Sequence, residues 1–305
     1  MIKKNSIVVI GSSNTDMVVK SAHLPQPGET IIGGTFFMNA GGKGANQAVA
    51  AARLGGNVTL VAKTGNDIFG KQAIKIFNEE GIDTTAVLTD EVLPSGVALI
   101  TVDDNAENCI VVAPGANAAL MTLDVKRFKR KIETASILLM QLEIPVETVA
   151  YATFVAANKK VKVILNPAPA CPLPDELLKH ISIITPNEKE AAMLTGISVT
   201  DIPSAEETAV YLHEKGIETV IITMGAKGAL LFHENEFSLI EAPIVKAVDT
   251  TAAGDVFNGA LAVALAEGKS MKDAVSFACH AASIAVTRLG AQASAPYRKE
   301  LKVES

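Results

Sequence analysis

Short apolar runs alternate with longer segments of helical periodicity along most of the chain, and this alternation narrows the possible folds more than any other feature. The apolar runs predict buried strands, and they read SIVVIG, VTLVAKTG, SILLMQLE, KVILNPAP, SIITPNE and TVIITMG. Several of the intervening segments end in glycine, a residue that commonly terminates helices. Strands and helices in alternation predict an α/β fold, in which helices cover both faces of a parallel sheet.

Two segments interrupt the alternation. Residues 14–38 and 96–112 each contain short apolar runs around a polar turn, a pattern typical of antiparallel strands. We expect these strands to pair into a small sheet outside the main layer. A chain of 305 residues, 49% of them hydrophobic, can bury a large core. We therefore expect one large domain, 1–305, with the small sheet inserted in it.

Charge and cysteine usage exclude several classes of partner. The formal net charge is -6, both signs are mixed, and we expect neither a nucleic-acid partner nor a membrane surface. No apolar stretch reaches the length of a bilayer span, and the run Ile7 to Ile10 is too short for a secretion signal. Cys109, Cys171 and Cys279 form neither a disulfide framework nor a zinc motif, so we expect a cytoplasmic protein.

The stretch NAGGKGANQAVAAARLGG looks like a phosphate-binding loop followed by a helix, but its spacing fits no nucleotide motif. Gln47 stands where a dinucleotide fingerprint requires Gly or Ala, and the preceding TFFMNA is a poor central strand. Gly44 follows Lys43 where a Walker loop requires Ser or Thr. The five histidines show no spacing typical of metal ligands.

The clearest indication of chemistry is VDTTAAGDVFNGAL. Ala252, Ala253 and Gly254 directly precede a helix expected to begin near Asp255, so their N–H groups can form an anion hole. Asp255 lies in the first turn, where it can accept a proton from an attacking hydroxyl. A helix cap is the ordinary interpretation of Gly-Asp. Capping alone explains neither the run of small residues nor the second carboxylate, Asp249.

The segment TPNEKE has two interpretations that the sequence leaves open. Asn187 and Glu190 are three residues apart at a helix start, so they share a face at the carboxyl end of a strand. There they can organise Mg²⁺, its waters and a phosphate. The same spacing is that of a capping box, in which the two residues only close the helix end.

Two turns are weaker candidates. In TMGAKG, Thr223 with Gly225 and Gly228 can hold a phosphate or a ribose, although an ordinary glycine turn is the more frequent meaning. In GSSNTD, Asn14 and Asp16 follow the first strand and suit the recognition of vicinal hydroxyls, although polar turns commonly have this composition.

Taken together, these motifs resemble the ribokinases, within the PfkB-type carbohydrate kinase family. The resemblance covers nearly the whole chain. It rests on the two signatures AGGKGANQAVAAARLG and DTTAAGDVFNGAL, with PGET, LNPAPA, ITPNE and AVTRLGAQ in order and at the expected spacing. It implies a three-layer sandwich with a mostly parallel central sheet and a small β-sheet lid formed by about 14–38 and 96–112. It also implies transfer of the ATP γ-phosphate to the 5-hydroxyl of D-ribose, and a homodimer that pairs its lids.

The resemblance also assigns roles to residues of this sequence. Asp255 matches the catalytic base, and the anion hole matches Ala252, Ala253 and Gly254. The sugar is expected at Asn14, Asp16, Gly42, Lys43, Asn46, Glu143 and Asp255. The nucleotide is expected at Asn187, Thr223, Gly225, Ala226, Lys227, Gly228, Gly254 and Cys279. Glu190 matches the carboxylate that organises Mg²⁺ through water. A loop for a monovalent cation, K⁺, is expected at Asp249, Thr251, Ala285, Arg288, Gly290 and Ser294, mostly through carbonyl oxygens.

One position departs from the family pattern, and other functions remain as alternatives. Cys279 stands where ribokinases usually place Asn or His beside adenine, so we expect it to pack on the base. The nearest alternative is a related kinase of 2-deoxyribose or fructose. A non-catalytic sugar-binding regulatory protein and a dinucleotide-dependent oxidoreductase are alternatives of other classes. Gly41 and Gly42 are expected to join the lid to the main domain.

Overall fold

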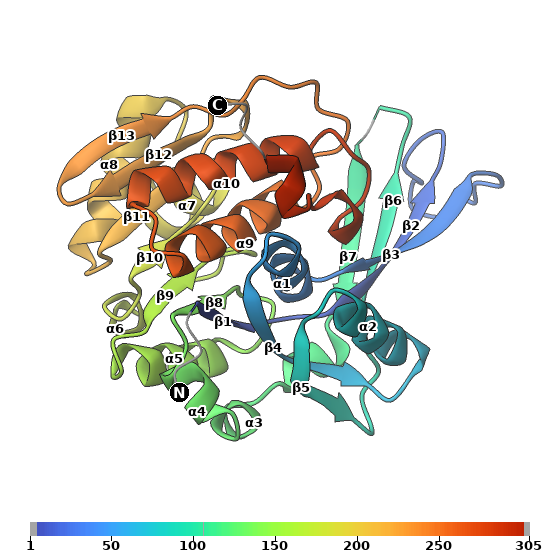
Figure 1. Ribbon diagram of the computed structural model, residues 1–305. Coiled ribbons are helices and arrows are strands. Elements are labelled where there is room, and N and C mark those ends of the chain that lie inside the picture. Colours follow the sequence, from blue (N-terminus) through green and yellow to red (C-terminus); the bar gives the residue numbers. More distant parts are fainter. Residues whose placement is uncertain (1–4, 106, 302–305) are drawn as a thin grey trace.

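The computed structural model describes residues 5–105 and 107–301 and shows a nine-stranded sheet with helices on both faces (Figure 1). The strand order is β13-β12-β11-β10-β9-β8-β1-β4-β5. Neighbours from β11 to β5 run parallel, whereas β12 pairs antiparallel with both β11 and β13 at one edge. The predicted α/β class with a mostly parallel sheet is therefore confirmed.

The main sheet contains each apolar run that the sequence marks as a strand. Its strands are β1 (Ser6–Ile10), β4 (Asn57–Gly65), β5 (Asp83–Asp90), β8 (Ile137–Met140), β9 (Lys162–Leu165), β10 (Ile183–Ile184), β11 (Thr219–Thr223), β12 (Ala229–His233) and β13 (Glu236–Ile240). The helices are α1 (Lys43–Arg53), α2 (Ile68–Glu79), α3 (Thr122–Lys126), α4 (Lys129–Glu133), α5 (Val146–Ala157), α6 (Asp175–Leu178), α7 (Glu188–Thr195), α8 (Ile202–Glu214), α9 (Ala253–Ala266) and α10 (Met271–Ala285). Short 3-10 helices are η1 (Gly115–Ala119), η2 (Gly225–Lys227), η3 (Gln292–Ser294) and η4 (Arg298–Leu301). Within the described ranges no helix is long and apolar enough to cross a bilayer.

Strand β1 shows why these runs are continuously apolar. Ile7 and Val9 point to one face of the sheet and join the core formed with α1, α9 and α10. Val8 and Ile10 point to the other face and join the core formed with α5 and α8. Successive side chains of a strand alternate between faces, so a sheet covered on both sides needs apolar residues at every position.

Helix α1 lies close to α9 because small residues line their contact. A Cβ placed on Gly259 of α9 would lie 2.8 Å from Ala50 Cβ and 2.8 Å from the carbonyl oxygen of Gln47. Only a glycine fits there without moving a helix. The alanine-rich character of α1 therefore sets a short distance between two helices that both carry polar residues at their N-terminal ends.

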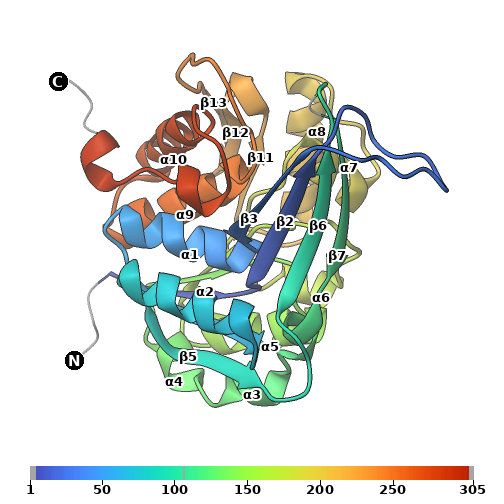
Figure 2. The same cartoon turned by 90° about the vertical axis from the view of Figure 1, so that its right-hand side faces the viewer.

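The two interrupting segments form a separate four-stranded sheet at the side of the main domain, in the order β3-β2-β6-β7 (Figure 2). It consists of β2 (Asn14–Lys20), β3 (Thr35–Gly41), β6 (Gly96–Val102) and β7 (Asn108–Ala113). Each hairpin is antiparallel as expected, but β2 and β6 join the hairpins in parallel. The sequence analysis left the pairing between the two hairpins open, and it is parallel because both inner strands leave the main domain in the same direction.

One face of the small sheet is apolar and exposed. The register places Met38, Met17, Leu99 and Val111 side by side across the four strands. Met38, Leu99 and Val111 are 50%, 54% and 62% exposed, and Phe36 extends the row at 58%. Exposed apolar patches of this kind commonly mark interaction sites.

A single glycine connects the small sheet to α1. Strand β3 ends at Gly41, and Gly42 has φ +87° before α1 begins at Lys43. A Cβ on Gly42 would also lie 2.6 Å from the backbone nitrogen of Asn14. Both the left-handed backbone and the close approach require glycine.

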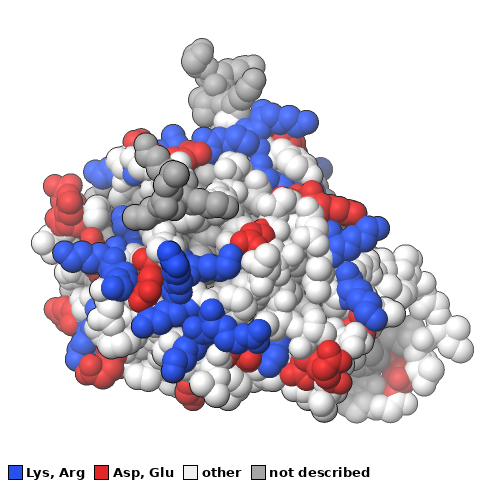
Figure 3. Space-filling model, turned by 60° about the horizontal axis from the view of Figure 1, so that its bottom comes forward, with Lys and Arg blue, Asp and Glu red and all other residues white. Residues whose placement is uncertain are grey.

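A basic cluster on the lower face was not anticipated from the sequence. Of the six residues 126–131, all but Phe128 are Lys or Arg. Lys131 pairs with Asp83 at 2.7 Å, and Lys129 lies 3.6 Å from Glu133. Figure 3, which brings the lower side of the molecule forward, shows basic and acidic side chains intermixed. None of these basic residues lines the main pocket described below.

Candidate active site

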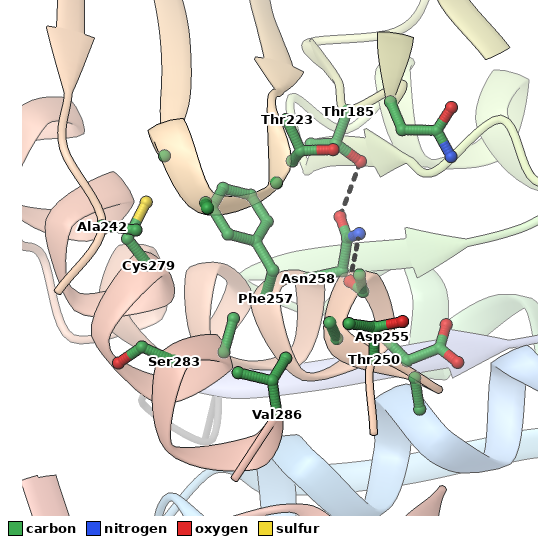
Figure 4. Close-up of a pocket in the computed structure, with 18 of the residues that line it drawn as sticks. Thr185, Thr223, Ala242, Thr250, Asp255, Phe257, Asn258, Cys279, Ser283 and Val286 are labelled. Carbon is green, nitrogen blue, oxygen red and sulfur yellow. Dashed lines mark hydrogen bonds between the residues drawn. The ribbon is translucent and has the colours of Figure 1, made fainter. Parts of the chain in front are cut away.

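A cavity of about 680 Å³ opens at the carboxyl ends of β9, β10 and β11, beside the N-terminus of α9 (Figure 4). Open α/β sheets bind ligands at this edge. The cavity brings together residues that are far apart in sequence. Of the residues proposed from the sequence, it is lined by Lys43, Asn187, Glu190, Thr223, Gly225, Ala226, Gly228, Ala252, Ala253, Gly254, Asp255 and Cys279.

The first turn of α9 presents unpaired N–H groups to the cavity. The helix begins at Ala253, after Ala252 with φ +59°, and the amide of Ala253 donates to Thr250 O at 3.3 Å. The amides of Gly254 and Asp255 donate to no described residue. Because a helix N-terminus carries partial positive charge, these two groups can bind an anion. The predicted anion hole at Ala252, Ala253 and Gly254 stays a prediction, and the amide of Asp255 is a further donor available to it.

The side chain of Asp255 does not cap its helix, so the capping interpretation was wrong. Its carboxylate is 5% exposed and turns toward α1. Oδ2 accepts a hydrogen bond from Asn46 Nδ2, and Oδ1 accepts one from Gln47 Nε2, each at 2.9 Å. Burial raises the pKa of Asp255, while the Lys43 charge and the two amide hydrogen bonds act in the opposite direction. A buried carboxylate with raised pKa suits a general base.

Lys43 is the cation that acts on Asp255, and Lys189 also lines the cavity. Burial lowers its pKa, but the charges of Asp255, Glu143, Glu190 and Asp16 raise it by more, so its pKa lies above the usual value. The ammonium therefore stays charged at neutral pH. One lysine among four carboxylates can steer and partly neutralise a phosphate close to Asp255.

The residues proposed for the sugar gather where the small sheet meets α1. Glu143 Oε2 accepts hydrogen bonds from the Lys43 backbone amide, at 3.0 Å, and from Ser12 Oγ. Asn14 Oδ1 accepts a hydrogen bond from Asn117 Nδ2 at 2.7 Å. Glu143 thus fixes the start of α1, and Asn14 is held by a second buried amide. Asp16 lies on β2 beside Gly41, with the carboxylate near the other acids of the site.

The Asn187–Glu190 pair forms the capping box, and its role at Mg²⁺ and a phosphate stays a prediction. Asn187 Oδ1 accepts from the Glu190 amide at 2.8 Å, and Glu190 Oε2 accepts from the Asn187 amide at 2.9 Å, which is a capping box. Both residues also line the cavity. No described residue donates to Glu190 Oε1. Asn187 is bridged to Thr223 at the end of β11, so the second nucleotide candidate lies next to it.

The far end of the cavity is apolar, and the sequence indicated little of it. Phe257, Cys279, Val286 and Ala242 line it (Figure 4), and Ile244 and Val245 belong to the same lining. Burial raises the pKa of the Cys279 thiol to about 11, so it packs as a neutral group. An apolar end opposite a charged end matches a ligand with a flat base and a polyanionic tail. Lys227 is exposed and does not line the cavity.

The loop proposed for a monovalent cation forms next to α9. The Asp249 carboxylate accepts hydrogen bonds from the amides of Thr251 at 2.8 Å and Gly290 at 2.9 Å, so it joins the two halves of the loop. The Arg288 guanidinium pairs with Glu300. The carbonyl oxygens of Asp249, Thr251, Arg288 and Gly290 accept no hydrogen bond from a described residue. Ser294 Oγ is turned to Ala291 O, and Ala285 O accepts the Arg288 amide.

Three buried amides near Asp255 were not selected from the sequence. They are Gln47, Gln141 and Asn166, all less than 9% exposed. Gln47 belongs to the signature GGKGANQ and Asn166 to LNPAPA, so the motifs contained them. Residue type alone does not distinguish an amide that contacts a ligand from one that contacts a buried acid.

Asp16→Asn is expected to stabilise the free protein at neutral pH. Burial, with the charges of Glu143 and Asp255, raises the pKa of Asp16 from 3.8 to about 6. A carboxyl whose pKa is raised by folding contributes stability that is fully present at pH values below its pKa in the unfolded state. That stability is lost as the pH rises through 6, its pKa in the folded state. The amide avoids that loss, so its free energy of unfolding at pH 7.5 should exceed that of the native protein by about 2–3 kcal/mol.

Urea unfolding at pH 5.0 and 7.5 measures this difference, which should shrink at the lower pH. Asp104→Asn removes an exposed carboxylate from the β6–β7 turn and serves as the matched control. An equal effect of Asp16→Asn at both pH values would contradict the prediction.

Comparison with known proteins identifies the family of the chain. Residues 4–298 match the model of the pfkB family of carbohydrate kinases. The chain is 47% identical to a ribokinase of Haemophilus influenzae, with 97% of each chain covered. It is 37% identical to a deoxyribokinase of Salmonella typhi, with 95% of each covered. The structure of an Arabidopsis thaliana ribokinase complexed with ribose and ATP superposes with a TM-score of 0.91 at 34% identity, covering 96% of each chain. The chain belongs to the pfkB family of carbohydrate kinases.

Proposed function

We propose that this kinase transfers the γ-phosphate of ATP to O5 of D-ribose, giving D-ribose 5-phosphate. The observation that carries the proposal is the buried Asp255 carboxylate at the first turn of α9, in a cavity that also holds Lys43. Relatives that are ribokinases, and the ribokinase solved with ribose and ATP, support the choice of substrates.

In the proposed reaction the 5-hydroxyl proton passes to Asp255 while the hydroxyl oxygen bonds to the γ-phosphorus, and the bond from that phosphorus to the bridging oxygen breaks to release ADP. Asn46 and Gln47 hold the carboxylate in place. The free amides of Gly254 and Asp255 stabilise the charge that develops on the transferred group. Asn258 Nδ2 donates to Gly254 O at 2.8 Å, so the first turn that presents these amides is braced from inside the helix.

The remaining residues fix the two substrates on opposite sides of Asp255. Asn14, Asp16, Gly42, Lys43, Asn46 and Glu143 hold the sugar. Asn187, Thr223 and the turn from Gly225 to Gly228 hold the phosphates and ribose of ATP, and the adenine packs beside Phe257 and Cys279.

We further propose that the small sheet is a lid that moves about Gly42 and excludes water, which would otherwise compete as the acceptor. Protection of α1 and β2 from hydrogen exchange should increase when sugar is added, and unchanged exchange would contradict lid closure.

The residues present fit a magnesium ion at the nucleotide side. Burial raises the pKa of Glu190, while the Asn187 amide and the Lys43 charge lower it, and Glu190 Oε1 remains free to accept a bond from a metal-bound water. Bound Mg²⁺ would supply neutralisation of the phosphate charge. Chelation with EDTA should abolish transfer, and excess Mg²⁺ should restore it.

We expect phosphate transfer to become faster when K⁺ replaces Na⁺ at constant ionic strength. The unpaired carbonyl oxygens of Asp249, Thr251, Arg288 and Gly290 can hold a large, weakly hydrated cation, which would order the turn that precedes α9. Initial rates in KCl and NaCl test this. The increase should diminish in Asp249→Asn, which weakens the hydrogen bonds that close the loop, and equal rates of the native protein in both salts would leave the loop without a cation role.

We propose that two copies pair through the apolar face of the small sheet formed by Phe36, Met38, Leu99 and Val111. A second copy would cover a face that is otherwise exposed to water. Sedimentation equilibrium should give a dimer mass for the native chain and a monomer mass for Leu99→Lys.

We also propose a cytoplasmic location, since Cys109, Cys171 and Cys279 are free thiols, and cell fractionation tests it.

A substrate panel tests the proposed function. Transfer of labelled γ-phosphate is measured with D-ribose, 2-deoxyribose and fructose at equal concentration. We expect D-ribose to give the highest kcat/KM. A preference for 2-deoxyribose would move the chain to the activity of its deoxyribokinase relative, and sugar binding without transfer would favour a non-catalytic regulatory protein.

A further inference from the structure

We infer that Gln47, held by Gln141 and Asn166, is a positioning residue that fixes the orientation of the Asp255 carboxylate. The inference rests on the proposed role of Asp255 as the base. It adds three buried side chains to the residues that support the reaction. All three are uncharged amides.

The two hydrogens of the Gln47 amide are both used. Nε2 donates to Asp255 Oδ1 at 2.9 Å and to Asn166 Oδ1 at 3.0 Å. Oε1 accepts from Gln141 Nε2 at 2.5 Å. The Gln47 amide therefore has one satisfied arrangement, because rotating it by 180° would place its oxygen against two acceptors and its NH₂ against a donor.

The supporting amides come from successive strands of the main sheet. Gln141 directly follows β8, and Asn166 directly follows β9, where Asn166 Nδ2 also donates to Thr185 O at 3.2 Å. Gln47 and Gln141 are fully buried and Asn166 is 6% exposed. A Cβ on Gly11 would lie 2.2 Å from Gln141 Oε1, so glycine leaves the room that Gln141 occupies. The row of amides thus connects the rigid sheet edge to the base.

A carboxylate with only one partner would be free to rotate about its own bond. Asn46 supplies the second partner, but Asn46 Oδ1 is buried and accepts no hydrogen bond. The Asn46 amide is therefore less constrained than that of Gln47. Of the two donors to Asp255, Gln47 is the one whose amide oxygen and nitrogen both make hydrogen bonds, although the oxygen of its partner Gln141 is buried without one.

Gln47 also affects the protonation of the base. The charged groups that face Asp255 are Lys43 on α1, Glu143 after β8, Asp16 on β2 and Glu190 on α7. The hydrogen bond from Gln47 favours the ionised carboxylate. Its removal should raise the pKa of Asp255, since the surrounding charges do not change.

Gln47→Met tests the inference because methionine keeps the length of the side chain and removes both donors. We expect kcat to fall roughly 10- to 100-fold, as for the loss of one hydrogen bond to a charged group. The KM for the sugar should change little, and the acidic limb of the kcat/KM profile should move to higher pH. Thr153→Val, which removes a buried hydroxyl without a partner on α5, is the matched control and should leave both quantities unchanged.

Gln141→Met provides a second, independent variant, because Gln141 contacts Gln47 and makes no hydrogen bond with Asp255. It should cause a smaller fall in kcat and a pH shift in the same direction. The double variant should be no worse than Gln47→Met alone, since both act through one contact. If Gln47→Met fails to fold, Gln141→Met decides the question alone.

Asp255→Asn separates the inference from the proposed function. If Asp255→Asn is inactive while the folded Gln47→Met and Gln141→Met proteins keep the native kcat and pH profile, the positioning role is wrong and the base assignment stands. If Asp255→Asn keeps its rate, the base assignment itself fails.

Discussion

Asp255→Asn is expected to reduce phosphate transfer by roughly 10²- to 10⁴-fold, the range that a general base contributes. The amide cannot accept the hydroxyl proton. The fold should persist, because the variant removes a buried charge whose desolvation raises the pKa of Asp255. The stability gained by removing the buried charge is partly offset, because one hydrogen bond is lost. The new NH₂ group of the asparagine faces the NH₂ group of Asn46 or Gln47, and two donors cannot bond to each other. Single-turnover phosphate transfer measures the rate, and calorimetry measures retained sugar binding.

Asp273→Asn is a matched control. Asp273 occupies the third position of α10, as Asp255 does in α9, but it is exposed and bonds to Ser270 at the helix start. Its replacement should cost at most about 1 kcal/mol in stability and leave kcat unchanged. A near-native rate for Asp255→Asn would show that another group accepts the proton.

Gly259→Val is expected to lower both the stability and the rate of the protein. Valine is a better helix residue than glycine by a few tenths of a kcal/mol, so propensity alone predicts a more stable protein. Packing predicts the opposite, because even a Cβ would lie 2.8 Å from Ala50 Cβ and 2.9 Å from the Ala51 nitrogen. Overpacking a core costs about 1–3 kcal/mol. The cost of overpacking exceeds the gain in helix propensity. Unfolding in urea should therefore show that the free energy of unfolding falls by about 2 kcal/mol.

The same change should also lower kcat. Moving α1 away from α9 separates Asn46 and Gln47 from Asp255, and a displacement of about 1 Å can cost roughly 10²-fold in rate. Ser276→Val adds the same branched side chain to an exposed position of α10 and should change neither stability nor rate by a comparable amount. A Gly259→Val protein with native stability would show that the two helices can separate freely.

The sequence predicted the layers and the main elements because each depends on local periodicity. The continuous run of β1 and the alanine-rich pattern of α1 are visible without any partner. The short elements α3, α4 and α6 were not predicted, since four or five residues carry too little periodic signal. The parallel pairing of β2 and β6 was also not predicted, because pairing between distant strands depends on topology rather than on either strand's pattern.

In the site, too, features that depend on local sequence were predictable, and features that depend on distant contacts were not. The motif around Asp255 and the capping-box spacing of Asn187 identified their positions, because helix starts have a local signature. The direction of the Asp255 side chain was not predictable, since it depends on donors that lie 208 and 209 positions earlier in the chain. The apolar end of the cavity was missed for a similar reason. Phe257 and Val286 look like ordinary core residues until the fold places them around one space.

The contact between α1 and α9 also determines when the protein can finish folding. Chains leave the ribosome from the N-terminus, and contacts between distant segments form late. The strands β1 and β4 can pair early, but the small-residue face of α1 has no cover until α9 has been synthesised. During translation that face is available to chaperones or to other nascent chains. A chain that ends before α9 would lack one wall of its core as well as the base, so partial synthesis cannot yield a partly active protein.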